Sequence, residues 1–187
     1  MHQYRIGIKT FSVRGFTLIE LIIAITILGI VLVLAVPNMT GVFQSNQATQ
    51  ESHDFVNAIQ LAVSEADTND TPVSLCAKKA ADNTCVTYAT NPATDVWGNG
   101  WLLFTDPAGN GIYDSSVDTL LKIKANPTNA ALLITAPATS VTITQASVVT
   151  RGSGTFDFRP KNCSGNGGHR IVLTANAQVT AAGLTCP

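Results

Sequence analysis

The chain has 187 residues, with 11 Lys+Arg against 12 Asp+Glu and a charged fraction of only 12%. That fraction is about half of the usual ~25%, which argues against a disordered protein and against a highly charged nucleic-acid coat protein. The length allows one domain and one additional segment.

A basic stretch followed by a long apolar stretch forms the N-terminus. Residues 16–36 contain 17 apolar side chains out of 21, and Arg5, Lys9 and Arg14 precede them without any acid. As a helix these residues reach about 30 Å, the thickness of a bilayer core, whereas a secretory signal has an apolar region of only about 7 to 15 residues. The positive residues favour the cytoplasmic side. The sequence therefore predicts a transmembrane helix over residues 16–36, with the residues that follow exported.

Glu20 interrupts this apolar run, where a charged side chain costs about 2.5 to 3.5 kcal/mol on insertion scales. The carboxylate either reaches back to the lipid headgroups or has a specific partner. The surrounding segment, RGFTLIE at residues 14–20, resembles the processing site of type IV prepilins and of the pseudopilins of type II secretion. This resemblance favours a specific partner.

The resemblance implies that an inner-membrane prepilin peptidase cuts between Gly15 and Phe16 and methylates the new N-terminal Phe16. Residues 1–15 are then a leader peptide, and their removal leaves eight basic against twelve acidic residues, a formal charge of −4. In such families the carboxylate at Glu20 pairs with the N-terminal amine of a neighbouring subunit inside a filament. The implied partners are other pilins or pseudopilins, the peptidase, the inner-membrane assembly platform and membrane lipid.

Residues 37–69 are predicted to continue the helix outside the membrane. Pro37 lies where the resembling family commonly has a proline, and proline removes a backbone donor, so we expect a helix bend there. Residues 44–54 are almost wholly polar, which indicates a solvated segment or one that contacts sister subunits. Apolar residues recur at spacings of three and four, which predicts an amphipathic helix that ends between Ala66 and Asn69. This apolar stripe consists of Met39, Val42, Phe43, Phe55, Val56, Ile59, Ala62, Val63 and Ala66.

From residue 70 onward the hydrophobic period changes to two, and Gly, Pro, Asn and Asp separate short β-rich runs. This pattern predicts an α+β fold, in which the helix packs on an antiparallel β-sheet head, residues 70–187, in the periplasm. The candidate strands are residues 101–105, 119–124, 131–135, 140–144, 154–159, 170–174 and 177–180.

Four cysteines, Cys76, Cys85, Cys163 and Cys186, fit two disulfides in an exported chain. Three connectivities are possible. Cys76 with Cys85 closes a ten-residue loop, and Cys163 with Cys186 is its complement. A zinc site is the alternative, but the chain has no Cys-x-x-Cys pair and its histidines lie far from the cysteines in sequence.

Residues 97–111 hold a second distinctive segment, in which WGNGW is followed by LLFTD and GNG. It resembles the central signature of the group that contains pseudopilin H of type II secretion and the minor pilins FimT and FimU. The residues themselves indicate a structural role, because the glycines suit turns and the two tryptophans suit a core.

The segment from Asp106 to Asp118 also invites a calcium hypothesis. Asp106, Asn110, Gly111 and Asp114 match positions one, five, six and nine of an EF-hand loop. The third and last ligand positions do not match, and the flanks are predicted strands. The alternative is a hairpin stabilised by side-chain turns.

No catalytic motif occurs, so we expect no enzyme and no cofactor or metal. Residues 51–118 carry ten acids against two lysines, whereas residues 151–187 have a net charge of +3. The cations Arg159, Lys161 and Arg170 could contact DNA phosphates. Some FimT proteins bind DNA through a Gly-Arg-x-Arg element near the C-terminus, but residues 174–180 here contain no arginine.

The leading hypothesis is a minor pilin or pseudopilin. It would leave the inner membrane, where its N-terminus is cytoplasmic and its head periplasmic, and enter a type IV pilus, near the tip where such subunits prime assembly. The alternatives are pseudopilin H of the type II secretion system and a DNA-binding minor pilin for natural transformation.

Overall fold

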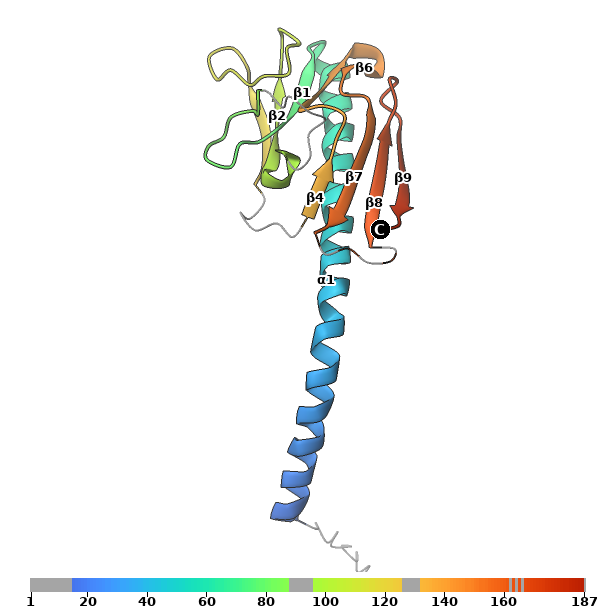
Figure 1. Cartoon of the computed structure of the whole chain (residues 1–187). Coiled ribbons are helices and arrows are strands. Elements are labelled where there is room, and N and C mark those ends of the chain that lie inside the picture. Colours follow the sequence, from blue (N-terminus) through green and yellow to red (C-terminus); the bar gives the residue numbers. More distant parts are fainter. Residues whose placement is uncertain are drawn as a thin grey trace, which may run out of the picture. The chain divides into compact units, whose positions relative to one another are not determined.

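The computed structural model describes residues 15–87, 96–125, 132–161, 163, 165 and 167–186, and within this range it leaves the side chains of residues 33–41 undescribed. The chain divides into two compact units, residues 1–39 and 40–187. Helix α1, Leu18–Asn69, contributes residues to both units (Figure 1). The nine strands that the structure describes all belong to the second unit.

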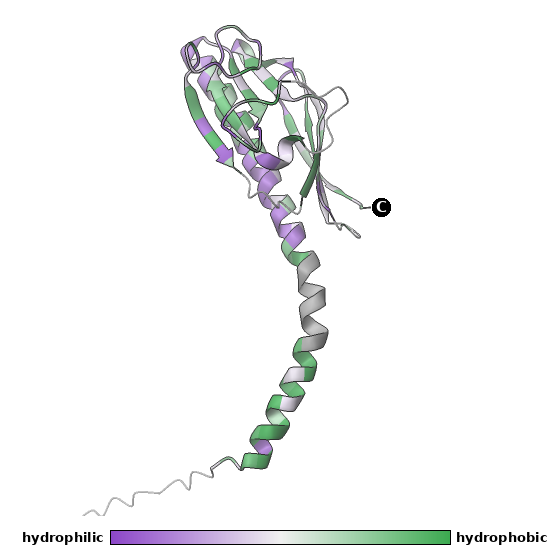
Figure 2. Cartoon of the chain, turned by 60° about the vertical axis from the view of Figure 1, so that its left-hand side comes forward, coloured by the Kyte–Doolittle hydropathy of each residue, from purple (hydrophilic) through white to green (hydrophobic). Residues whose placement is uncertain are grey.

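In the first unit, the described residues of α1 form an exposed apolar helix (Figure 2). Every residue from Gly15 to Leu32 is exposed. One of the polar side chains in this stretch is satisfied locally, because the Thr26 hydroxyl donates to the carbonyl oxygen of Ile22 at 2.7 Å. Within the described part of the chain, no helix combines the length and the hydropathy that crossing a membrane requires.

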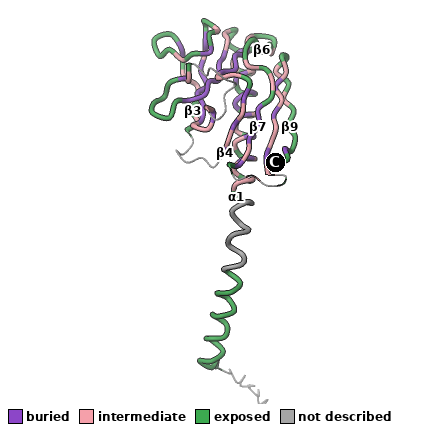
Figure 3. The backbone as a smooth tube through the Cα atoms, viewed as in Figure 1, coloured by how far each residue is buried: buried purple, intermediate pink, exposed green. Residues whose placement is uncertain are grey.

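In the second unit, one face of α1 is buried in the head (Figure 3). The fully buried residues on this face include Ala58, which the predicted stripe omitted, whereas Val42 and Phe43 are exposed and lie outside the core. The helix ends at Asn69, as predicted, and Asp70 follows in the left-handed conformation with φ 52°. A residue of this conformation is a common helix C-terminal signal. The helix residues that lie in the main core cluster are Phe55, Ala58, Ile59, Ala62 and Ala66.

The head contains two antiparallel sheets. The first has the strand order β3-β2-β1-β5-β6, with β1 Val73–Ala77, β2 Gly100–Thr105, β3 Leu120–Ala125, β5 Ser140–Thr144 and β6 Val148–Arg151. The second has the order β4-β7-β8-β9, with β4 Leu132–Thr135, β7 Gly154–Pro160, β8 Gly168–Leu173 and β9 Val179–Leu184. Two short 3-10 helices, η1 Val96–Asn99 and η2 Gln145–Ser147, precede β2 and β6. The core joins α1 to side chains from both sheets.

The α+β fold and all seven candidate strands are confirmed, but two strands were missed. Every residue of β1 is buried, so its sequence lacks the alternation that identifies a half-buried strand. Strand β6 has only four residues and follows Ala146 and Ser147, which both have positive φ angles. The head is also split into two sheets, where the sequence indicated one.

Both disulfides form, with the pairing in which Cys76 joins Cys85 and Cys163 joins Cys186. The first connects the buried strand β1 to the loop that follows it, and its sulfurs lie in a small cluster with Leu102. No free cysteine is left among the described residues.

Candidate assembly site

The start of α1 is a capping box built from Thr17 and Glu20. The Glu20 carboxylate accepts the backbone N–H of Thr17 at 2.9 Å and its hydroxyl at 2.8 Å, both through Oε2. In return, the backbone N–H of Glu20 reaches the Thr17 hydroxyl oxygen at 3.3 Å. A threonine followed three residues later by glutamate satisfies backbone donors that a helix start otherwise leaves unpaired.

This capping box leaves the second carboxylate oxygen of Glu20 available. Among the described residues, Oε1 has no hydrogen-bond partner, and the whole side chain is exposed. A carboxylate in the first helical turn also interacts favourably with the helix dipole. Glu20 can therefore keep its local bonds and still accept a donor from another molecule.

The predicted processing point lies next to this box. Phe16 is 85% exposed, and no atom lies within 4 Å of a Cβ placed on Gly15. Both residues are therefore accessible. The bend at Pro37 concerns a side chain outside the described residues, and it stays a prediction together with the membrane span over residues 16–36.

The two tryptophans of the WGNGW segment serve the core, as predicted. Trp97 and Trp101 are buried, and the Trp97 indole N–H donates to the carbonyl oxygen of Ala138 at 2.8 Å. Gly100 between them has φ 98°, and a Cβ there would lie 2.0 Å from the Lys124 carbonyl oxygen. Only glycine fits this position, because the neighbouring strand is too close for a side chain.

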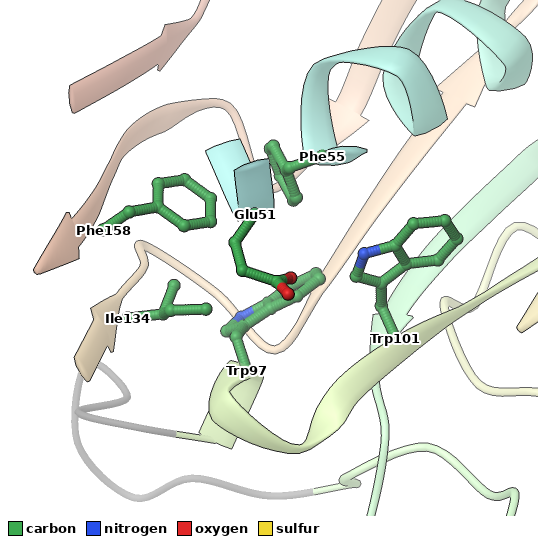
Figure 4. A pocket seen from close by; sticks show the side chains of 6 residues that line it. All are labelled: Glu51, Phe55, Trp97, Trp101, Ile134 and Phe158. Carbon is green, nitrogen blue, oxygen red and sulfur yellow. The ribbon is translucent and has the colours of Figure 1, made fainter. Parts of the chain in front are cut away.

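The same tryptophans line a small pocket under α1 (Figure 4). Among the described residues that line it, Glu51 is the one acid, and its carboxylate is drawn beside Trp97 in the figure. Glu51 is paired with Lys124 of β3 at 3.4 Å, and Lys124 also bonds Asp54 one turn further along the helix. The remaining lining residues are Phe55, Trp101, Ile134 and Phe158. The pocket thus belongs to the contact between helix and sheet.

The segment 106–118 forms a hairpin loop stabilised by side-chain turns. The buried Asp106 carboxylate accepts the backbone N–H groups of Asn110 at 3.2 Å and Gly111 at 2.7 Å, and the Ser74 hydroxyl at 2.7 Å. Asp118 accepts the N–H of Asp114 at 2.8 Å. Within the described residues, no group of three or more His, Cys, Asp or Glu side chains is arranged to hold a metal ion.

Two of the three predicted DNA contacts come together on the second sheet. Arg170 binds the Asp157 carboxylate with Nε at 2.7 Å and Nη2 at 2.8 Å, and Arg159 Nη2 binds it at 3.0 Å. Hydrogen bonding and charge from Arg170 lower the pKa of Asp157, while burial opposes that shift. Lys161 is exposed just beyond β7. Neighbouring His169 points to the other face, where Nε2 lies 2.8 Å from the Thr49 hydroxyl.

Sequence reasoning missed two residues that organise these sites. Thr17 could have been found, because Thr-x-x-Glu before an apolar run is the signature of a capping box. Asp157 could not, because its partner Arg170 comes from another strand, 13 residues away.

Two protein-family models match parts of this chain. Residues 51–178 match the family model described as type II transport protein GspH, and residues 11–36 match the prokaryotic N-terminal methylation motif. None of the curated proteins compared with the chain matches it.

Two crystal structures of the type IV minor pilin FimU from Pseudomonas aeruginosa resemble the chain. In one crystal form the TM-score is 0.51 at 18% identity, over 73% of this chain and 89% of that chain. In the other the TM-score is 0.47 at 19% identity, over 71% and 91%. The first likeness supports the shared fold of a helix packed on antiparallel strands.

Proposed function

Since this chain belongs to the family of the type II transport protein GspH, we propose that it enters its filament through Glu20. It is a minor pilin or pseudopilin subunit. The observation that carries the proposal is the geometry at the start of α1, where one oxygen of Glu20 caps the helix and the other has no partner among the described residues.

Processing supplies the missing partner. Cleavage between Gly15 and Phe16 creates a positive amine on Phe16, one residue before the capping box. The amine of one subunit then meets Oε1 of Glu20 in its neighbour, and the two charges compensate each other in apolar surroundings. The exposed apolar residues of α1 pack against the same neighbours. The capping box persists after cleavage, because both of its residues follow the cut.

Membrane residence precedes assembly. Pilins with this methylation motif are anchored in the inner membrane before they assemble, and we place residues 16–36 there, with the head in the periplasm. Glu20 lies close to the cytoplasmic end of that segment, where its capping bonds to Thr17 reduce the cost of holding an unpaired carboxylate among lipids.

Replacing Glu20 by glutamine tests the proposal. Glu20→Gln keeps an acceptor for Thr17 but loses the charge, and removing one partner of a buried ion pair costs about 3 to 5 kcal/mol. We expect the variant to reach wild-type levels in the membrane and to fall at least about tenfold in sheared filaments, measured by immunoblot. Thr26→Val is the matched control, because it also removes a polar group from the same apolar run but changes no charge. Normal filament levels of Glu20→Gln would refute the role of the charge.

Mass spectrometry of the filament-bound chain tests the processing step. We expect a mature protein that begins at N-methylated Phe16. An intact leader on filament-bound subunits would contradict the proposal, because Phe16 would then have no free amine for Glu20.

We further propose that the filament is a type IV pilus, because the long segment from Cys163 to Cys186 resembles the pilus members of the group more than pseudopilin H. A deletion strain separates the two machines. Loss of surface pili with normal protein secretion supports the pilus, and normal pili with impaired secretion places the chain in a secretion pseudopilus.

A further inference from the structure

The outward face of the second sheet presents two arginines that share one carboxylate. Arg159 and Arg170 both bind Oδ2 of Asp157 through their Nη2 atoms, at 3.0 and 2.8 Å, so these two nitrogens lie within about 6 Å of each other. Asp157 is 8% exposed, whereas the Arg159 and Arg170 side chains are 31% and 42% exposed. Two guanidinium groups are thus held in place by a buried acid, and one positive charge remains uncompensated.

The strand register places this group on the side of the sheet that faces away from the core. In β7, Phe156 and Phe158 are buried against α1, so the intervening Asp157 points to the opposite face. Arg170 is the direct neighbour of Asp157 across the β7–β8 pair. Lys161, an exposed residue that has an interaction of its own, lies at the end of β7. We call Asp157, Arg159, Lys161 and Arg170 the basic face.

Another part of the head carries the opposite charge. The loop after β1 and the loop between β2 and β3 touch each other, since the Tyr113 N–H lies 3.1 Å from the Cys85 sulfur. In Figure 1 these loops project from the side of the head opposite β9. We call residues 79–84 and 106–118 the acidic lobe. This lobe contains four acids and one lysine, Lys79. Asp82 and Asp114 are exposed, whereas Asp106 and Asp118 are buried.

We propose that the basic face binds the acidic lobe of a second copy of this chain. The inference rests on the proposed function as a filament subunit, and it adds a contact between heads. Because the two surfaces are different parts of the head, the contact is heterologous and can repeat along a polymer. Arginine forks held in position bind carboxylates with little loss of side-chain freedom.

The local charge favours a protein partner over DNA. A duplex carries one negative charge per about 1.7 Å of helix axis, and it binds surfaces that neutralise several phosphates at once. Here Asp157 lies between the two arginines and repels a continuous run of phosphates. Scattered carboxylates, such as Asp82 and Asp114 on the acidic lobe, match the small surplus of positive charge better.

Sedimentation velocity of the full-length chain in detergent tests the contact with two charge variants. The basic-face variant is Lys161→Gln with Arg170→Gln, which leaves Arg159 to partner Asp157. The acidic-lobe variant is Asp82→Asn with Asp114→Asn, because asparagine keeps the acceptor oxygens of the turns. Lys122→Gln, a charge change on β3 whose ammonium group lies over the Trp101 ring, is the matched control.

We expect the wild-type chain to self-associate at low salt and to dissociate as salt is raised. Each variant alone should associate at least about tenfold more weakly, and an equimolar mixture of the two should recover dimers, since one variant keeps the lobe and the other keeps the basic face. Recovery in the mixture also shows that both variants are folded. The Lys122→Gln control should associate like the wild type.

Three results would overturn the proposal: no salt-sensitive association of the wild type, no recovery in the mixture, or duplex DNA binding that the basic-face variant loses while self-association is unchanged. Glu20→Gln separates this inference from the proposed function. That variant keeps the basic face and the acidic lobe, so head association in detergent should persist even where filament entry fails.

Discussion

Removing the aromatic ring of Phe55 is the sharpest test of how α1 is attached to the head. The ring is 2% exposed and lies at the centre of an aromatic cluster. Its centroid is 5.6 Å from Trp97 in an edge-on arrangement, 4.6 Å from Phe156 and 5.7 Å from Phe158. Phe55→Ala therefore removes contacts both to η1 and to the second sheet.

The expected cost can be estimated from these contacts. A buried Phe→Ala change costs about 3 to 5 kcal/mol, and each aromatic pair contributes about 0.5 to 1.5 kcal/mol beyond burial, although pairs that share a ring do not add. We expect about 4 kcal/mol, near the middle of the range. A unit of this size loses about 2 to 4 °C per kcal/mol, so the melting temperature should fall by roughly 10 °C.

Thermal unfolding of the full-length chain, followed by near-ultraviolet circular dichroism, measures this effect. Leu61→Ala is the matched control, because Leu61 lies on the same helix but is 36% exposed, and the expected loss is below about 1 kcal/mol. If Phe55→Ala and Leu61→Ala lowered the melting temperature by the same amount, the view that the Phe55 cluster anchors the helix would be refuted.

Three further predictions concern Thr17, Arg170 and Asp118. Thr17→Ala removes the capping bonds and should cost about 0.5 to 2 kcal/mol at the helix start; we expect lower filament levels by immunoblot, restored by Thr17→Ser. Because Arg170 lowers the pKa of Asp157, the pair stabilises the fold above the ordinary aspartate pKa and loses this effect as the pH falls through the lowered value. Melting curves of Arg170→Gln should therefore show a smaller loss of stability in acid. Burial raises the pKa of Asp118, with nearby Asp106 adding to the shift, so the charged form destabilises the fold at neutral pH, and Asp118→Asn should raise the melting temperature there.

Each of these predictions can fail separately. Unchanged filament levels in Thr17→Ala would remove the capping box from the assembly account. An acid transition in Arg170→Gln as steep as in the wild type would show that Asp157 does not contribute through that pair. A melting temperature of Asp118→Asn that equals the wild-type value near pH 7 and in acid would contradict the burial of an unfavourable charge.

Much of the fold was predictable because local sequence patterns determine it. The apolar run, the helical stripe around Ile59 and Ala62 and the two-residue period of the head each depend on residues close in sequence. The end of the helix at Asn69 and the pairing of Cys76 with Cys85 are short-range features of the same kind. Strand β1 escaped detection because a fully buried strand has no solvent-facing positions, and so no alternation, to reveal it.

The sequence by itself identified the proposed assembly segment, since Gly15, Phe16 and Glu20 are recognised by their spacing before one apolar run. Only the tertiary structure decided which charges meet on the head. It brought Lys124 to Asp54 across 70 residues and set Arg170 beside Asp157 on a neighbouring strand. Such pairs depend on sheet register and helix docking, and these arise from packing of the whole chain, because no local preference specifies which distant strand a residue will face.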